Sequence, residues 1–273
     1  MLVDLHTHSN ASDGQLSPAE LLNSAAAAGI NLLAITDHDT VAGYARLNIA
    51  AAHTCKVIPG IELSTYWRKI GIHVVGLNID LQNPALLAGI MQQQAARLQR
   101  SQIIALKLEK LGFADVLDGA TKLAGESVIG RPHFARHLVN TGQVKSMKDA
   151  FRKYLGPGKP GDVRDVWAPM EEVIEWIHQA GGSAVLAHPA KYRLTNLKME
   201  ELAKAFRASG GDALEVISGK QDGTLTVRLG KLATRVGLKA SAGSDFHQTG
   251  QSWAALGDVA RLPANCTPVW ESW

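Results

Sequence analysis

The chain of 273 residues is predicted to be an α/β protein, folded as a parallel α/β barrel or something close to it. Two observations predict this class: apolar runs of strand length alternate with segments of helical periodicity, and these runs end in histidine, aspartate or glutamate. With 46% hydrophobic and 19% charged residues, the composition is that of an ordinary globular protein. The formal net charge of +3 is too small to indicate nucleic-acid binding by itself, but it is compatible with an anionic substrate.

The first part of the chain is expected to run β-α-β-α-β-β. A short strand ends at His6 and His8, and the helix after it has recognisable ends. Ser17 and Glu20 have the spacing of a capping box, and Gly29 stops the helix. The next elements are expected to be a strand over 31–39, a helix over 40–53 and strands over 56–64 and 70–79.

The composition and periodicity of the sequence change after Pro84. A long helix is expected over 95–113, and the chain up to about residue 165 is rich in Lys, Arg and Gly without apolar strand runs. Residues 98–167 are therefore predicted to be an inserted, mostly helical subdomain, and residues 1–97 and 168–273 to form the barrel. The second barrel segment is expected to contain helices over 169–181, 199–210 and 225–237 and strands over 182–189, 212–218 and 238–247.

Two features predict where the protein resides. Cys55 and Cys266 are the two cysteines and lack CxxC spacing, which indicates neither a disulfide framework nor a thiolate zinc site. The N-terminus lacks the pattern of a secretory signal, and no apolar run approaches membrane-spanning length. We therefore expect a cytoplasmic protein with no membrane partner; the sequence does not indicate its oligomeric state.

The ends of the predicted strands indicate a metal site. A single His-x-His pair is common on strand surfaces, but six of the ten histidines lie at or near strand ends. In a parallel α/β barrel these ends open onto one shared mouth, so the side chains should converge. The converging residues are expected to be His6, His8, Asp37, His38, Asp39, Glu62, His73, His188, Asp245 and His247. Imidazoles and carboxylates without thiolate suit Mn, Zn or Fe.

Asp37 and Asp39 flank His38 and have two interpretations. Either carboxylate can orient the imidazole of His38. Asp39 can instead cap a helix that begins near Thr40, and this second interpretation is favoured.

Cationic residues in the insertion are candidates for binding phosphate. Arginine offers a planar fork that matches phosphate oxygens, and Arg131 in "GRPHFAR" is the leading candidate. The alternative is a solvated surface helix, and Arg164 is expected to be such a surface residue. Lys191 and Arg193 follow a strand end and are expected in a loop at the mouth. The full set of candidate substrate-binding residues is Arg131, His133, Arg136, Lys159, Lys191 and Arg193.

The segments "HTHSNASDG", "ITDHD", "PGIELS" with "IHVVG", "LAHP" and "GSDFH" resemble the motifs of the PHP (polymerase and histidinol phosphatase) superfamily of metal-dependent phosphoesterases. The resemblance implies a distorted (β/α)7 barrel that holds two or three divalent metal ions, with Mn favoured. By this resemblance, His6, His8, Glu62 and Asp245 would bind one ion. Glu62 would bridge to a second at His73 and His188, and a third would lie at Asp13, His38 and His247.

The insertion narrows the expected activity. Its segments "VIGRPHFARHLV" and "YLGPGKPGDV" are similar to the branch that removes the 3′-phosphate of nucleoside 3′,5′-bisphosphates and trims short RNA from its 5′ end. The resemblance implies a phosphomonoesterase whose nucleophile is a metal-bound hydroxide, with no protein nucleophile. Two alternatives stay open. One is a histidinol-phosphate phosphatase, which needs a single cationic phosphate site, and the other is a metal-binding accessory module without turnover.

Overall fold

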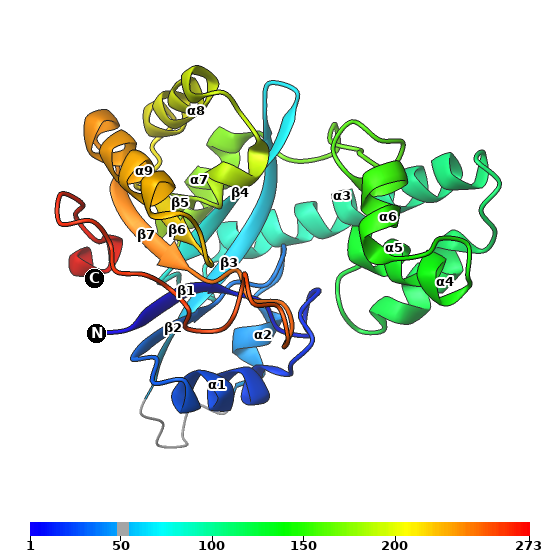
Figure 1. The fold of residues 1–273 in the computed structure, drawn as a ribbon, viewed down its shortest axis with the longest axis horizontal. Helices are drawn as coiled ribbons and strands as arrows, with labels where there is room; N and C mark the ends of the chain where they lie inside the picture. Colours follow the sequence, from blue (N-terminus) through cyan, green and yellow to red (C-terminus); the bar gives the residue numbers. More distant parts are fainter. Residues whose placement is uncertain (48–54) are drawn as a thin grey trace.

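The computed structural model describes residues 1–47 and 55–273. Figure 1 shows a barrel of strands covered by helices, and a lobe of helices at one side that the long helix α3 (Pro84–Glu109) joins to the barrel. The helix predicted over 40–53 is described only up to residue 47, where α2 (Ala42–Ala45) forms a single turn. The rest of that prediction lies outside the described residues.

One sheet forms the barrel, with its strands in the order β1-β2-β3-β4-β5-β6-β7 among the described residues. The strands are β1 (Val3–Thr7), β2 (Leu32–Ile35), β3 (Lys56–Trp67), β4 (Ile70–Leu77), β5 (Ser183–Leu186), β6 (Ala213–Ser218) and β7 (Lys239–Gly243). The ends of the sheet meet where His8 N–H donates to Phe246 O at 2.9 Å and Asp245 N–H donates to His6 O at 2.8 Å. The predicted barrel of PHP type is thus confirmed.

Strand β4 departs from the parallel arrangement. It pairs antiparallel with both β3 and β5, whereas the other neighbouring strands are parallel. The reason is the two-residue connection between β3 and β4: a parallel pair needs a crossover of a dozen or more residues. The start of β4 therefore lies at the same rim as the ends of the parallel strands, and His73 in its first half reaches the mouth.

Helices cover the outside of the barrel, as their sequence patterns predict. They are α1 (Pro18–Ala27), α2, α7 (Met170–Gln179), α8 (Asn196–Ala208) and α9 (Gly223–Val236), with 3-10 turns at Pro189–Tyr192 and Val269–Ser272. The capping box of α1 is confirmed, because Ser17 Oγ accepts from Glu20 N–H and the Glu20 carboxylate accepts from Ser17 N–H. Helix α1 buries Leu21 and Leu22 against β2, so the capped end positions the chain that follows β1.

Helix α3 begins 11 residues before the expected start, at Pro84 after the Asn83 cap, and runs unbroken from the barrel into the lobe. It packs closely on α7, where a Cβ at Gly89 would come within 2.3 Å of the Trp176 indole. The predicted boundary at 97/98 therefore falls inside this helix.

The helical lobe has an apolar core of its own. It is built from the C-terminal half of α3, α4 (Val116–Ala124), α5 (Arg131–Asn140), α6 (Met147–Ala150) and a π-helical turn at Phe151–Leu155. Its buried members include Ile104, Leu108, Val116, Phe134, Leu138 and Leu155. The barrel clusters contain none of these described residues. Division of the chain into a barrel and an inserted subdomain stays a prediction that this packing supports.

Both described cysteines carry free thiols, with Cys55 buried. Within the described part of the chain, no helix combines the length and the apolar character that crossing a membrane requires.

Candidate functional site

The nine residues predicted to bind metal lie together at the mouth of the barrel. Glu62 is at the centre of the cluster, in the middle of the 12-residue strand β3 rather than at its end. Its Oε1 lies 2.8 Å from His73 Nδ1 and 2.9 Å from His188 Nε2, and its Oε2 lies 3.0 Å from His38 Nδ1. His6 and His8 approach the same carboxylate at 3.4 and 3.3 Å.

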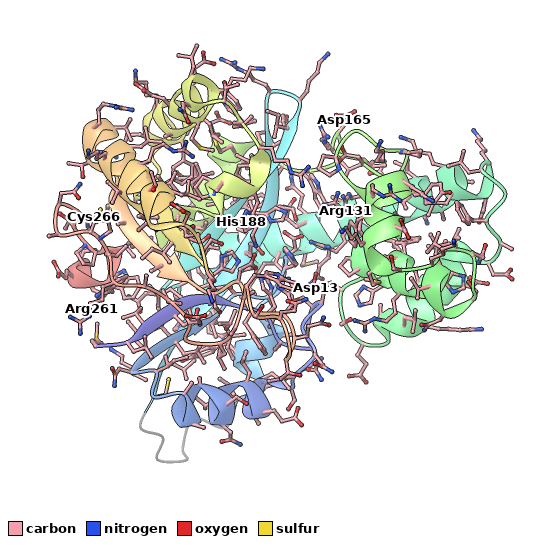
Figure 2. The ribbon with its side chains drawn as sticks, in the orientation of Figure 1. Asp13, Arg131, Asp165, His188, Arg261 and Cys266 are labelled. Carbon is pink, nitrogen blue, oxygen red and sulfur yellow. The ribbon has the colours of Figure 1, made fainter. Side chains whose placement is uncertain are left out.

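Two further carboxylates complete the cluster. Asp245 Oδ1 lies 3.3 Å from His8 Nε2 and 3.6 Å from His6 Nε2. Asp13, in the loop after β1, has its Oδ1 3.3 Å from His247 Nε2 and its Oδ2 3.8 Å from His38 Nε2. Figure 2 shows Asp13 and His188 near the middle of the molecule, with Arg131 on the side of the lobe that faces them.

Unsatisfied buried atoms show that these residues fit metal ions. Leaving a buried polar atom without a partner costs free energy, and folded proteins contain few such atoms. Among the described residues, eight buried side-chain nitrogen and oxygen atoms lack a hydrogen-bond partner, and seven of them belong to this cluster. They are His6 Nε2, His8 Nδ1 and Nε2, Asp13 Oδ1, His38 Nδ1, Glu62 Oε2 and His188 Nδ1.

The spacing of the ligand atoms allows more than one ion. Four groups bring their nitrogen or oxygen atoms within 4.8 Å of one another. The groups are His8, Asp13, His38 and His247; His6, Glu62 and His188; His6, His8 and Asp245; and His38, Glu62 and His73. Glu62 belongs to two of them, which is the arrangement that a bridging carboxylate requires.

The protein environment keeps His8 and His188 in the neutral form that binds metal. Burial and the neighbouring His247 lower the pKa of His8 to about 3, and burial lowers the pKa of His188 to about 4. Both are therefore neutral near pH 7, and neutral imidazole is the form that binds metal. Burial also acts to lower the pKa of His6, but the Glu215 and Glu62 carboxylates outweigh it and raise this pKa to about 10.

Glu215 on β6 is a functional residue that the sequence analysis missed. It is 2% exposed, its Oε1 lies 3.0 Å from His6 Nδ1, and its other oxygen accepts a hydrogen bond from His188 N–H. Metal-binding histidines commonly donate their second ring N–H to a carboxylate, which fixes the ring. The signal was an acidic residue inside the apolar run "ALEVIS".

Asp37 and Asp39 have roles that differ from both interpretations. Asp37 accepts hydrogen bonds from Ser9 Oγ and Ser12 Oγ, each at 2.6 Å, and so fixes the loop that carries Asp13. The prediction that Asp39 caps a helix is wrong, because α2 begins at Ala42 and has no side-chain cap. Asp39 is instead fully buried, accepts from Ser64 N–H at 2.8 Å and pairs with Arg97.

A cavity of about 920 Å³ opens beside the cluster, between the barrel and the lobe, and Asp13, His38 and His73 form part of its wall. Four arginines also line it: Arg97, Arg100, Arg131 and Arg164. Arg97 and Arg100 come from α3, where their guanidinium carbons lie 5.3 and 5.1 Å from the ring centre of Trp167. Neither arginine was identified from the sequence, because nothing local distinguishes them from surface residues of a helix.

The four arginines have little negative charge beside them. Asp39 pairs with Arg97, and Asp162 pairs with Arg164 and lies 3.9 Å from Arg131. Asp13, on the side of the metal-binding residues, also acts on Arg131. Burial and the charges of Arg97 and Arg164 lower the pKa of Arg131 to about 10, and burial and the charges of Arg131 and Arg97 lower that of Arg100 well below its usual value. Arginine keeps its proton in proteins, so these shifts express the cost of burying positive charges, to which repulsion between the arginines adds. A bound anion would lower that cost.

The other candidates divide between two places. Lys159, Lys191 and Arg193 line this cavity, whereas His133 and Arg136 line a neighbouring hollow. Lys191 Nζ contacts Asp245. The expectation that Arg164 is a surface residue is wrong: its side chain is 27% exposed and lies in the cavity wall.

Fold and site together define a barrel protein with a buried cluster of imidazoles and carboxylates that fits several metal ions. The chain belongs to the PHP domain family, whose model matches residues 4–224. The predicted resemblance is thereby confirmed.

Two relatives agree with the narrower resemblance. The chain is 43% identical over 270 residues to the 3′,5′-nucleoside bisphosphate phosphatase of Chromobacterium violaceum, which covers 98% of this chain and 95% of that protein. It is also 43% identical over 276 residues to the 5′-3′ exoribonuclease Rnm of Escherichia coli, covering 100% of this chain and 94% of the relative.

Two solved structures share the fold. One is described as an amidohydrolase from Chromobacterium violaceum with bound sulfate and no metal; it has a TM-score of 0.90 and 42% identity and covers 100% of this chain and 95% of its own. The other is described as a putative metal-dependent phosphoesterase from Bifidobacterium adolescentis. Its TM-score is 0.80 and its identity 28%, and the match covers 99% of this chain and 93% of that one.

Proposed function

We propose that this protein is a metal-dependent phosphomonoesterase that removes the 3′-phosphate from nucleoside 3′,5′-bisphosphates and also releases nucleotides from the 5′ end of short RNA. The observation that carries the proposal is the arginine-lined cavity beside the cluster of metal-binding residues. Such a substrate has two phosphates, and the site offers two distinct places for them. The names of the relatives support the same reaction.

The metal cofactor is part of the proposal. We propose that two or three divalent ions, with Mn favoured over Zn or Fe, are held by the nine cluster residues, with Glu62 as the bridge. Ions bound there would stabilise charge on the phosphate oxygens and lower the pKa of a bound water. Location in the cytoplasm belongs to the same proposal, and the free thiols of Cys55 and Cys266 support it.

The protein's own residues position the substrate. Arg131 and its neighbours bind the phosphate that is not cleaved, because guanidinium forks match its oxygens and their charge is under-compensated. Asp39 and Trp167 hold Arg97 in the cavity wall, while Glu215 holds the ring of His6. In the overall reaction, water oxygen bonds to phosphorus, the bond between O3′ and phosphorus breaks, and O3′ takes up a proton.

The structure favours this activity over both alternatives. A histidinol-phosphate phosphatase binds a substrate with one phosphate, so the arginines of the cavity would have no second phosphate to bind. An accessory module without turnover does not need a cavity of about 920 Å³ that opens onto the ligands. Both alternatives make predictions that one assay separates.

The test is a screen for phosphate release by Mn-loaded protein. The substrates are adenosine 3′,5′-bisphosphate, AMP, histidinol phosphate and a short 5′-phosphorylated RNA, each with and without a chelator. We expect rapid release from the bisphosphate, nucleotide release from the RNA and loss of both with the chelator. Preference for histidinol phosphate, or release that persists after metal removal is verified by elemental analysis, contradicts the proposal.

A further inference from the structure

A second hollow adjoins the cluster of metal-binding residues. It has a volume of about 360 Å³, and Ser12, Asp13 and Pro132 line both it and the arginine-lined cavity. We call it the 3′ hollow. Asp13, a member of the metal-binding cluster, therefore borders two open spaces: the arginine-lined cavity and the 3′ hollow.

The walls of the 3′ hollow suit a nucleic-acid backbone. They come from the loop after β1, from Arg46 after α2 and from the lobe around α4 and α5. Arg46 and Arg136 bring positive charge, and Asn10, Gln15 and Ser127 bring neutral polar groups. Asp13 and Glu126 also line the hollow, Asp13 at the end shared with the metal-binding residues. Glu126 lies 3.8 Å from Arg46 but its side chain is 94% exposed, so it compensates that charge weakly.

The proposed reaction on RNA needs such a second space. In a bisphosphate, the phosphate at the metal-binding cluster carries no further group. In RNA, the same phosphate is esterified to the next nucleoside, so the remaining chain must leave the cluster on another side. The arginine-lined cavity is taken by the first nucleoside and its 5′-phosphate.

We infer that the 3′ hollow binds the phosphodiester chain that follows the scissile bond, with Arg46 and Arg136 as its phosphate contacts. This inference rests on the proposed function. Water oxygen bonds to phosphorus, the bond from O3′ to phosphorus breaks, O3′ takes the proton, and the remaining chain keeps the phosphate on its 5′ oxygen. That new 5′-phosphate is the group that the arginine-lined cavity binds, so the shortened chain is again a substrate.

The test compares substrates of different length in one variant. Arg46→Ala should lower kcat/KM for a 5′-phosphorylated tetraribonucleotide by about 5- to 10-fold, since it removes one partly exposed contact between charged groups. The same variant should leave phosphate release from adenosine 3′,5′-bisphosphate unchanged. Arg46→Lys should restore part of the loss. Arg228→Ala, an exposed arginine of α9, is the matched control and should change neither activity.

A binding measurement separates this inference from the proposed function. Affinity of metal-loaded protein for a tetraribonucleotide with phosphorothioate linkages is measured by fluorescence anisotropy at several salt concentrations. Arg46→Ala removes one phosphate contact, so the slope of log affinity against log salt should be smaller than that of the wild-type protein by about 0.7. An unchanged slope, or an equal loss of activity on bisphosphate and tetranucleotide, overturns the inference. Failure of the wild-type protein to hydrolyse the bisphosphate would instead contradict the proposed function, while the binding slope still judges the 3′ hollow.

Discussion

Arg131→Ala tests how the protein recognises the phosphate that is not cleaved. The Arg131 side chain is 27% exposed and donates to Leu155 O at 3.1 Å, and its nearest carboxylate is 3.9 Å away, so most of its donors face the cavity. A hydrogen bond between charged groups contributes about 1.5–3 kcal/mol. The variant should therefore lower kcat/KM for adenosine 3′,5′-bisphosphate by about 10- to 150-fold.

The assay compares two substrates under the same metal loading. p-Nitrophenyl phosphate lacks a second phosphate, so its hydrolysis should change little in Arg131→Ala. Arg235→Ala, which removes an exposed arginine of α9 that pairs with Glu200 and does not line the cavity, should affect neither substrate. The melting temperature of each variant shows whether the fold is intact.

Two results refute the reasoning about Arg131. Equal losses on both substrates would place Arg131 at the reacting phosphate or in the fold. No loss on either would show that Arg131 contacts neither phosphate, which would leave the uncleaved phosphate without an identified partner.

Two further predictions concern buried carboxylates, and a third concerns removal of the metal. Glu215→Gln should lower metal affinity by about 10- to 100-fold, because it weakens the orientation of His6; competition with a chelating dye measures this, and unchanged affinity contradicts the role. Asp39→Ala should lower the free energy of unfolding of the metal-free protein by about 3–5 kcal/mol in urea, since Arg97 is left buried and unpaired. If the free energy of unfolding falls by less than about 1 kcal/mol, water solvates the Arg97 charge in the variant and the buried ion pair contributes little. Removing metal from the wild-type protein should lower its melting temperature, because ions that bind the folded state stabilise it; an unchanged melting temperature shows that the cluster binds no metal.

Much of the barrel follows from local signals in the sequence. The capping-box spacing of Ser17 and Glu20 predicts the start of α1. The alternation of apolar runs and helical patterns predicts the order of the strands and helices. The ligand cluster was predictable because barrel topology brings strand ends together, so residues far apart in the sequence could be grouped. His73 is the instructive case: its place depends on β4 being antiparallel, and the short connection to β3 is the physical cause.

The cavity could not be predicted in the same way. Arg97 and Arg100 lie on a helix that extends into the lobe, and their meeting with Arg131 and Arg164 depends on how the lobe packs against the barrel. No periodicity in the sequence encodes that packing. Asp39 illustrates the same point, since its partner Arg97 is 58 residues away and a local cap was the nearest available explanation.

We expect the imidazoles and carboxylates at the mouth of the barrel to form a metal centre bridged by Glu62. Metal content of the purified wild-type protein and of Glu62→Gln, measured by mass spectrometry of the elements, tests it most directly. We expect about two or three divalent ions per chain in the wild type and a clear loss of metal in Glu62→Gln, because the neutral amide cannot bridge two cations as the carboxylate does. Equal metal content in the two proteins would contradict it.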